Sequence, residues 1–451
     1  MARKLFGTDG IRGRANTYPV NPEIALKLGK AVGKHFKAIG GFGQRVVIGK
    51  DTRLSGYMLE NALTSGLVSM GMDVFLVGPV PTPAVAHLTK SLACIAGFMI
   101  TASHNPYTDN GIKIFNADGF KLNDAAEEEI EGYIFDGDLQ PSDEDAPKLG
   151  QARRIEDARG RYIEFAKSAI RSENIRDMKI VLDCANGASY LLGPWIFCEL
   201  GAKVIKMAAS PDGLNINENC GAMHPQMMAR KVVETGADIG IAFDGDADRV
   251  IFSDENGHLI NGDRVLAMLA LDFKKSGRLA KDTLVVTSMS NLGLHQAMHA
   301  AGIKVETTDV GDRYVIERML EKKYNLGGEE SGHVIVLDYA TTGDGIITAL
   351  SVMNLMKRTG KKISQLADCM REFPKRLEGV YVREKKPLDE LPIVNAHVKE
   401  CRSSLGDNGR VIIRYSGTEM KMRLLVEASD SNLVDTWTDR IVSAIRQEIG
   451  A

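Results

Sequence analysis

Three aspartates stand at alternate positions in the segment Asp244-Gly245-Asp246-Ala247-Asp248, directly after the apolar run Ile239–Phe243. Carboxylates this close repel one another, so without a cation between them at least one must raise its pKa and take a proton. A hard, oxygen-seeking ion such as Mg²⁺ is the economical explanation, and a solvated acidic turn is the alternative. An EF-hand calcium loop is excluded because its sixth position should be glycine and is Arg249 here. The segment predicts a divalent metal site.

A serine stands in a second segment, Thr101–Pro106, which follows the apolar run Ala93–Ile100. The carboxyl end of a buried strand is where open α/β sheets place their ligands. The dipeptide Asn105-Pro106 favours a turn and keeps the chain out of a helix, which leaves the Ser103 hydroxyl and the His104 ring exposed on a stiff loop. Taken alone, the segment fits a plain turn as well as a nucleophile.

Two further loops offer groups that bind sugars or phosphates. The segment Arg414–Glu419, with Arg423 beyond it, combines hydroxyls, a glycine backbone and guanidinium groups, which suits a phosphate dianion. The segment Gly327–His333 carries Glu329 and Ser331, which suit a ligand rich in hydroxyl groups. A hairpin turn is the alternative for both segments.

The elements that must position these groups follow a repeated plan. An apolar strand, a helical stretch, a glycine and a second strand recur in residues 46–74, 180–204 and 284–305. The glycines Gly71, Gly201 and Gly302 stand where a helix needs a left-handed C-terminal cap, and β-branched residues resume soon after each. Three strand-helix-strand crossovers of one design are therefore predicted.

After about residue 369 the pattern changes to strands over 379–382, 410–414 and 423–427 with helical stretches between them. The predicted fold class is α/β, with four domains: three repeated α/β units and a smaller C-terminal α+β domain. The acidic, proline-containing stretch Asp136–Pro147 is predicted to be a solvated loop near the first boundary. The predicted domains are residues 1–154 with the serine loop, 155–255 with the metal loop, 256–368 with the Glu329 loop and 369–451 with the Arg414 loop.

Bulk composition excludes several classes of function. A length of 451 residues requires several domains, and the net charge of −3 provides no positive field to hold nucleic acid. The N-terminus lacks a signal-peptide pattern and no run of 18 apolar residues occurs, so a cytoplasmic protein without membrane contact is expected. The scattered cysteines are expected to be reduced thiols, with Cys94, Cys184 and Cys198 in the core.

Together with the loop Phe6–Gly13, from which little follows unaided, these segments resemble the α-D-phosphohexomutase family across the whole chain. The segments Leu5–Gly10, Gly213–Asn217 with Cys220-Gly221, and Val310–Tyr314 look like the branch that acts on amino sugar phosphates. The resemblance implies four domains around a deep cleft. One departure is Ala247, where many members have glycine; a positive φ there would strain the metal loop.

The resemblance also implies roles for single residues. Ser103 would carry the phosphoryl group, and one Mg²⁺ per chain would be held by that serine's phosphoryl oxygen and by Asp244, Asp246 and Asp248. The residues expected near the transferring phosphoryl group are Arg12, His104, Lys113 and Arg249. Sugar hydroxyls would be contacted by Glu329, Ser331 and His333. The phosphate that does not react would be held by Arg414, Ser416, Gly417, Thr418 and Arg423.

The reaction implied is the interconversion of glucosamine 6-phosphate and glucosamine 1-phosphate through a 1,6-bisphosphate, which also activates the enzyme, on the route to UDP-N-acetylglucosamine and cell-wall precursors. A phosphoglucomutase or phosphomannomutase with the same chemistry is the nearest alternative. A hydrolase that releases the phosphoryl group to water and a non-catalytic phosphosugar-binding protein are more distant ones. A monomer and a homodimer are both open.

Overall fold

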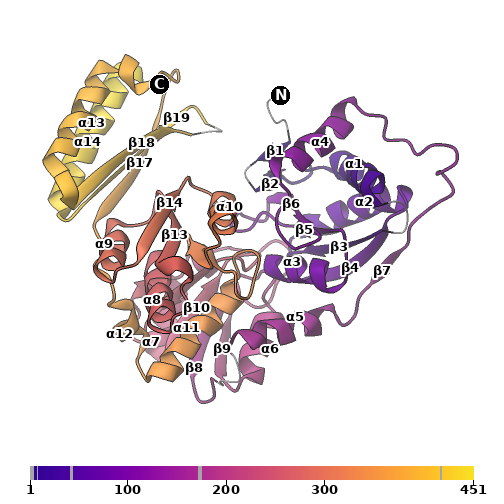
Figure 1. The fold of residues 1–451 in the computed structure, drawn as a ribbon, viewed down its shortest axis with the longest axis horizontal. Coiled ribbons are helices and arrows are strands. Elements are labelled where there is room, and N and C mark those ends of the chain that lie inside the picture. Colours follow the sequence, from indigo (N-terminus) through magenta and orange to yellow (C-terminus); the bar gives the residue numbers. More distant parts are fainter. Residues whose placement is uncertain (1–4, 8, 41–43, 171–174, 417–418) are drawn as a thin grey trace. The chain divides into compact units, whose positions relative to one another are not determined.

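The computed structural model describes residues 5–7, 9–40, 44–170, 175–416 and 419–451. The chain forms two compact units: unit 1 spans Met1–Met289 and Ala301–Cys369, and unit 2 spans Ser290–Ala300 and Met370–Ala451. In the described residues, unit 1 contains sheets of seven, five and four strands, and unit 2 contains a sheet of three (Figure 1).

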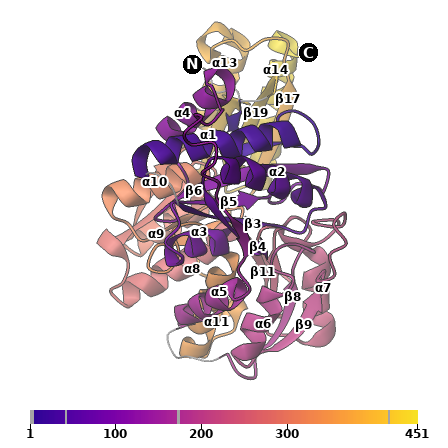
Figure 2. The same cartoon turned by 90° about the vertical axis from the view of Figure 1, so that its right-hand side faces the viewer.

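The seven-stranded sheet comes from the first part of the chain. Its strand order is β1 (Phe6–Gly7), β2 (Gly10–Arg14), β6 (Asp109–Asn116), β5 (Ala96–Ile100), β3 (Arg45–Lys50), β4 (Asp73–Pro79) and β7 (Ala152–Arg154). Helices α1 (Pro22–Gly40), α2 (Ser55–Ser69) and α4 (Asp124–Asp136) lie on one face, and α3 (Thr82–Ser91) lies on the other (Figures 1 and 2). Strand β3 is parallel to β4 and β5, whereas β6 returns antiparallel to β5.

Helices α1 and α2 approach each other closely because glycines face one another at their contact. A Cβ atom added at Gly66 would lie 2.2 Å from the carbonyl oxygen of Leu26 and 3.0 Å from the Cα atom of Gly29. Real Cβ atoms do not approach a backbone oxygen this closely, so any side chain at Gly66 would force the two helices apart.

The five-stranded sheet has the order β12 (Leu259–Ile260), β11 (Val250–Ser253), β10 (Ile239–Phe243), β8 (Lys179–Asp183) and β9 (Lys203–Met207). Its helices are α5 (Ala158–Lys167), α6 (Leu192–Glu199) and α7 (Gln226–Thr235). The four-stranded sheet has the order β14 (Lys304–Thr308), β13 (Thr283–Thr287), β15 (Leu326–Gly328) and β16 (Val334–Val336). Helices α8 (Gly262–Lys275), α10 (Asp312–Lys322), α11 (Gly345–Thr359) and α12 (Ile363–Ala367) belong to this part of the chain.

The predicted repeat is confirmed. Each of the three repeats contains a pair of parallel strands separated in sequence by a helix: β3 and β4, β8 and β9, β13 and β14. The three glycines have positive φ, with values of 84° at Gly71, 91° at Gly201 and 70° at Gly302. Left-handed geometry at these positions ends each helix and turns the chain into its second strand.

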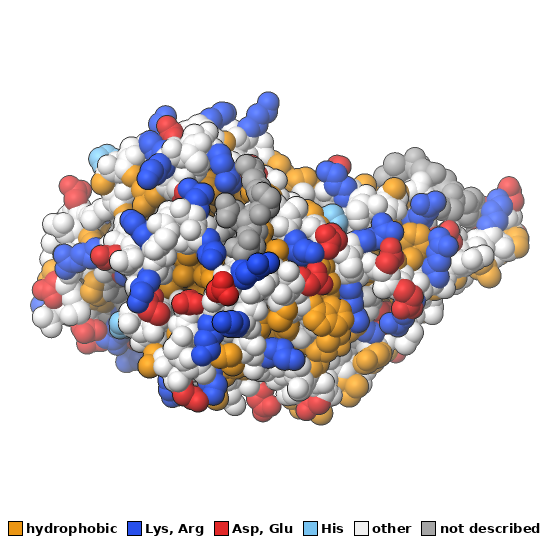
Figure 3. All heavy atoms as spheres, turned by 90° about the horizontal axis from the view of Figure 1, so that it is seen from below, with side chains coloured by type: hydrophobic (Ala, Val, Ile, Leu, Met, Phe, Trp, Pro, Cys, Tyr) orange, Lys and Arg blue, Asp and Glu red, His pale blue; other side chains and the backbone are white. Residues whose placement is uncertain are grey.

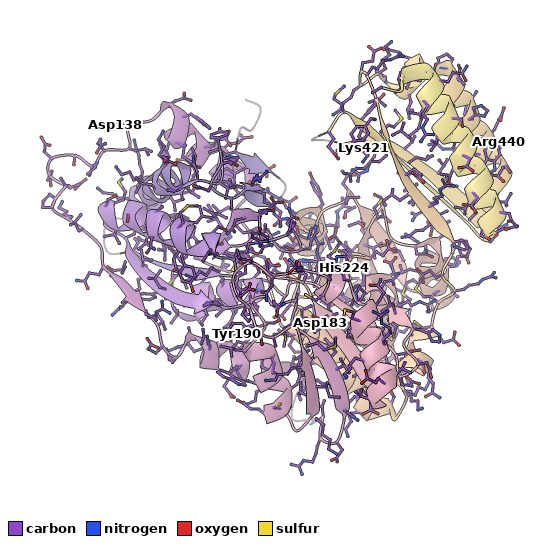
Figure 4. The ribbon with its side chains drawn as sticks, turned by 180° about the vertical axis from the view of Figure 1, so that it is seen from behind. Asp138, Asp183, Tyr190, His224, Lys421 and Arg440 are labelled. Carbon is purple, nitrogen blue, oxygen red and sulfur yellow. The ribbon has the colours of Figure 1, made fainter. Side chains whose placement is uncertain are left out.

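Unit 2 has the α+β character predicted for the tail. Its antiparallel sheet has the order β17 (Lys375–Tyr381), β19 (Lys421–Ala428) and β18 (Gly409–Tyr415), and α13 (Pro392–Leu405) and α14 (Ser431–Ile449) pack on it. Figure 4 labels Lys421 on β19 and Arg440 on α14. Helix α9 (Leu292–Ala300) also belongs to unit 2, because the Leu292 N–H donates to the Glu427 carboxylate at 2.9 Å.

On the face drawn in Figure 3, basic and acidic side chains are interspersed. Among the described residues, no helix is both long and apolar enough to cross a bilayer.

Cys94 and Cys184 are buried as predicted, but the core prediction for Cys198 is wrong: it is exposed on α6 while its neighbour Phe197 is buried. Because a helix turns by about 100° per residue, adjacent residues point in different directions, so the burial of Phe197 does not imply that Cys198 is buried.

The glycine contact between α1 and α2 predicts opposite effects for two helical Gly→Ala substitutions in one domain. Gly66→Ala should lower the free energy of unfolding by about 1–3 kcal/mol through overpacking. Gly132→Ala in α4, where an added Cβ meets nothing within 4 Å, should raise it by roughly 0.5–1 kcal/mol through helix propensity. Unfolding midpoints of the two variants measure this, and equal effects of one sign would contradict the packing account.

Candidate active site

The three aspartates predicted to bind metal lie together. They follow the buried strand β10, all three are buried, and carboxylate oxygens of Asp244, Asp246 and Asp248 lie within 4.8 Å of one another. Burial, with the neighbouring Asp248 and Asp246 carboxylates, raises the pKa of Asp244 well above its usual value. Part of this rise is the repulsion expected from the sequence, which a positive charge between the carboxylates would relieve.

The donor set fits a hard divalent cation. Asp246 Oδ2 accepts hydrogen bonds from Thr82 Oγ1 at 2.5 Å and Lys113 Nζ at 3.0 Å, whereas its Oδ1 is buried without a hydrogen-bond partner. A buried carboxylate oxygen without a partner is costly, and a metal ion at the cluster would satisfy it. All the candidate ligands are oxygens, which suits Mg²⁺ or a similar ion.

The serine loop lies against the metal loop. Ser103 follows β5, and its Oγ donates to Asp244 Oδ2 at 2.6 Å. The prediction that the Ser103 hydroxyl is exposed is wrong: the residue is 1% exposed, because loops of the second domain cover it. A Cβ atom added at Gly245 would lie 2.6 Å from the Ser103 carbonyl oxygen, so the two loops are in backbone contact.

His104 and Arg249 form the next layer around the serine. His104 Nδ1 lies 3.4 Å from Ser103 Oγ and 3.1 Å from Arg249 Nη1. Burial, then the positive charges of Arg249 and Arg12, lower the pKa of His104 to about 4. Its ring is therefore neutral at pH 7. Because the Arg249 guanidinium is always a donor, it directs the Nδ1 lone pair of His104 toward itself.

The side chain of Lys113 places a positive charge among the carboxylates. It projects from β6, and its Nζ lies 3.0 Å from both Asp246 Oδ2 and Asp248 Oδ2 and 3.4 Å from Asp9 Oδ2. Burial alone would lower the pKa of Lys113, but the carboxylates of Asp246, Asp248 and Asp9 raise it well above its usual value. Lys113 is thus a permanent cation at neutral pH.

A second layer of charge, which the sequence interpretation missed, connects the N-terminal loop to α10. Lys121 pairs with Asp9 and with Asp312, the latter at 2.5 Å. Asp9 also pairs with Arg12, the residue predicted from the same loop. Asp9 and Asp312 lie in segments that the sequence analysis had singled out, so both could have been proposed as site residues. No motif around Lys121 indicates such a role.

His333 stands between two carboxylates of this network. Its Nδ1 lies 3.7 Å from Asp248 Oδ1 and its Nε2 3.5 Å from Asp312 Oδ2. The Gly343 N–H donates to Nε2 at 3.2 Å, which places the ring proton on Nδ1, facing Asp248. The hairpin β15–β16 thus brings the Glu329 loop to the metal loop.

A pocket of about 380 Å³ opens beside these groups. It brings together the predicted residues Arg12, Asp248, Arg249, Glu329, Ser331 and His333, and it is also lined by Asp9, Thr287, Met289, Val310, Gly311, Asp312 and Glu330. Residues 327–333 lie in a hairpin, because Gly328 pairs with Val334 in the antiparallel pairing of β15 with β16. A polar pocket of this size suits a small, hydroxyl-rich ligand.

The predicted phosphate loop belongs to unit 2. Arg414 and Arg423 are directly opposite each other in the β18–β19 pairing. Like charges at opposed positions repel, so an anion between them would be stabilising. Ser416 is buried beside them, and its carbonyl oxygen accepts from Lys385 Nζ at 2.7 Å. The predicted residues Gly417 and Thr418 lie outside the described residues.

Family models match the chain from end to end. Four domains described as phosphoglucomutase/phosphomannomutase are found in order: alpha/beta/alpha domain I over residues 3–141, domain II over 160–257, domain III over 261–373 and the C-terminal domain over 379–444. They cover most of the chain and include the serine, metal, Glu329 and Arg414 loops.

Similar proteins agree with this match. A protein of Pelobacter propionicus named phosphoglucosamine mutase is 51% identical over 449 residues, which cover 99% of each chain. A Burkholderia thailandensis structure of a phosphoglucomutase/phosphomannomutase family protein has a TM-score of 0.80 at 23% identity, covering 98% of this chain and 97% of its own. An Aspergillus fumigatus N-acetylphosphoglucosamine mutase, solved with GlcNAc-6P and magnesium, has a TM-score of 0.68 at 17% identity, covering 99% and 96%.

The contact between the serine and metal loops predicts different outcomes for substitutions at two positions of the metal loop. Gly245→Ala forces the loops apart and should weaken the binding of Mn²⁺, used as a probe, by about tenfold or more. Ala247→Gly, where φ is 57° and no ligand atom is lost, should leave it within about threefold, since glycine accepts this conformation. Calorimetric titration measures both, and unchanged binding in Gly245→Ala would contradict the loop contact.

Proposed function

Since the chain belongs to the phosphoglucomutase/phosphomannomutase family, we propose that it is a phosphoglucosamine mutase, an isomerase that interconverts glucosamine 6-phosphate and glucosamine 1-phosphate. The observation that carries the proposal is a buried serine whose Oγ lies 2.6 Å from a carboxylate of a three-aspartate metal group. This arrangement lies in a chain about half identical, over its whole length, to proteins of that name.

The chemistry proposed is two phosphoryl transfers. In the first, the bond between phosphorus and Ser103 Oγ breaks and a bond to O1 of glucosamine 6-phosphate forms; the O1 hydroxyl loses its proton and the serine regains one. The resulting 1,6-bisphosphate then turns over in the site. In the second transfer, the bond between phosphorus and O6 breaks and a bond to Ser103 Oγ forms; the serine loses its proton, O6 gains one, and glucosamine 1-phosphate leaves. Covalent storage on the serine divides one long displacement into two short ones.

The metal proposed for the aspartate cluster is Mg²⁺, held by Asp244, Asp246 and Asp248 together with a phosphoryl oxygen on Ser103. When bound, the ion neutralises charge on the phosphoryl oxygens. The all-oxygen donor set and the unpartnered Asp246 Oδ1 support this choice.

Phosphoryl transfer requires alignment and positive charge around the equatorial oxygens. Lys113, Arg12 and Arg249 supply that charge beside Ser103. His104 lies next to the serine, and because its pKa is lowered to about 4 its ring adds no charge there at pH 7.

Two groups of residues are proposed to contact the substrate. Glu329, Ser331 and His333 contact the sugar hydroxyls in the pocket of unit 1. The phosphate that does not react is bound by the unit 2 loop through Arg414, Ser416, Gly417, Thr418 and Arg423. Because the bisphosphate must bind in two opposite orientations, these groups must contact hydroxyls that both orientations present.

The cytoplasm is the compartment proposed, because all six cysteines are free, as is typical of a reducing environment. A monomer or a homodimer is proposed as the working form, with a small phosphosugar as its ligand.

The alternative is a phosphoglucomutase or phosphomannomutase, because the matched domain models describe both activities. Rates on the 6-phosphates of glucosamine, glucose and mannose separate the two hypotheses. The proposal predicts the highest kcat/KM on glucosamine 6-phosphate, by about tenfold or more. A higher kcat/KM on glucose or mannose 6-phosphate would replace this function with the alternative, and release of inorganic phosphate without an isomer would indicate a hydrolase.

The metal assignment predicts the effect of a single substitution. Asp246→Asn removes a negative ligand but keeps the shape of the side chain, and it should lower kcat by about 100-fold, which excess Mg²⁺ only partly restores. Steady-state rates across a Mg²⁺ titration measure this. A rate equal to that of the unaltered enzyme at ordinary Mg²⁺ would refute the assignment.

A further inference from the structure

The backbone of Ser103 is in a conformation that needs support. Its φ is 51°, in the left-handed region that non-glycine residues rarely adopt. Such a residue is strained and persists only where its surroundings fix it. The Ser103 N–H donates to Thr101 Oγ1 at 2.8 Å, but this bond lies on one side of the residue only.

Two side chains hold the other side. Arg53 Nη2 donates to the carbonyl oxygens of Ser103, at 3.2 Å, and Asn105, at 2.5 Å. Asn217 Nδ2 donates to the same two oxygens, at 2.8 and 2.9 Å. We call these four hydrogen bonds the carbonyl clamp. They restrain the peptide groups that follow Ser103 and Asn105.

Arg53 is itself rigidly held. Arg53 is fully buried, and its guanidinium pairs with the buried Asp51. The backbone N–H of Arg53 also donates to Asp51 Oδ1 at 2.9 Å. The Asp51 N–H in turn donates to the carbonyl oxygen of Ile100, at the end of the strand that leads to Ser103. A guanidinium oriented in this way loses little freedom when it forms the clamp.

Asn217 reaches the serine loop from the second domain. Its N–H donates to the Ala185 carbonyl at 2.9 Å, and the Asp183 carboxylate, at the end of β8, accepts from the N–H of Ala185 (Figure 4). Asn217 has φ of 58°, which suits asparagine. A Cβ atom at Gly245 would lie 2.8 Å from Asn217 Nδ2, so the clamp also touches the metal loop.

We propose that Arg53 and Asn217 are positioning residues, which hold Ser103 in its left-handed conformation and so keep its Oγ beside Asp244 for phosphoryl transfer. The inference rests on the proposed role of Ser103 as the phosphoryl carrier. Neither residue lines the pocket beside the metal loop. The clamp therefore acts on the alignment of the serine and leaves contacts with the sugar unchanged.

Asn217→Gly is the decisive variant, because glycine accepts the positive φ at this position and only the side-chain donors are lost. Thr52→Val is the matched control: it removes another hydrogen bond between the same domains, from Thr52 Oγ1 to the Asn186 carbonyl at 2.5 Å, and touches neither clamped oxygen. Arg53→Lys is a second variant, which keeps the positive charge beside Asp51 but not the two-pronged donor.

Kinetics are measured on whichever hexose 6-phosphate the unaltered enzyme converts fastest, so a different sugar preference leaves the test intact. Asn217→Gly should lower kcat by about 10- to 100-fold while KM stays within about twofold, since misalignment acts on the chemical step. Arg53→Lys should give the same pattern and Thr52→Val should not. Amide hydrogen exchange of residues 101–107 should become faster in the two clamp variants alone.

Asn217→Gly with an unchanged kcat, a rise in KM in place of the fall in kcat, or an equal loss in Thr52→Val would overturn the clamp. Activity retained in Ser103→Ala would instead remove the serine as carrier. Exchange rates report on the loop without turnover and so distinguish the two failures.

Discussion

The structure depends on placing three carboxylates together in a buried site. Asp244, Asp246 and Asp248 have oxygens within 4.8 Å of one another, where mutual repulsion is strong. Protonation of one carboxylate would reduce this repulsion, and the pKa of Asp244 is raised by burial and by its two neighbouring carboxylates. Lys113 relieves more of it, with Nζ 3.0 Å from two of the carboxylates. The remaining demand for positive charge is what makes the cluster suited to a divalent ion.

The repeated architecture of unit 1 brings the chemistry to that cluster. Ser103 follows β5, the aspartates follow β10 and Glu329 follows β15, each at the carboxyl end of a strand in a different sheet. Buried strands fix where each loop begins, and short loops leave little freedom for the residues that follow. The carbonyl clamp and the Lys121 network then connect loops from different domains. Alignment of the serine is thus a property of docked domains rather than of any one of them.

Local patterns predicted much of this fold, because each depends on residues close in sequence. The Asp-x-Asp-x-Asp spacing located the metal group, and the glycines at 71, 201 and 302 located the helix ends. Contacts between residues far apart in sequence were not predictable in this way. Asn217 donates to the Ser103 carbonyl oxygen, 114 residues away, and Lys121 pairs with Asp312, 191 residues away. The burial of Ser103 was missed for the same reason, since the loops that cover it come from another domain.

Phosphorylation of Ser103 tests the account most directly. The protein is incubated with glucosamine 1,6-bisphosphate and Mg²⁺, its intact mass is measured before and after, and the modified peptide is mapped, with Ser103→Ala treated in parallel. The account predicts a gain of one phosphoryl group on the peptide containing Ser103 and none in the variant. No gain, or a gain on another residue, would contradict it.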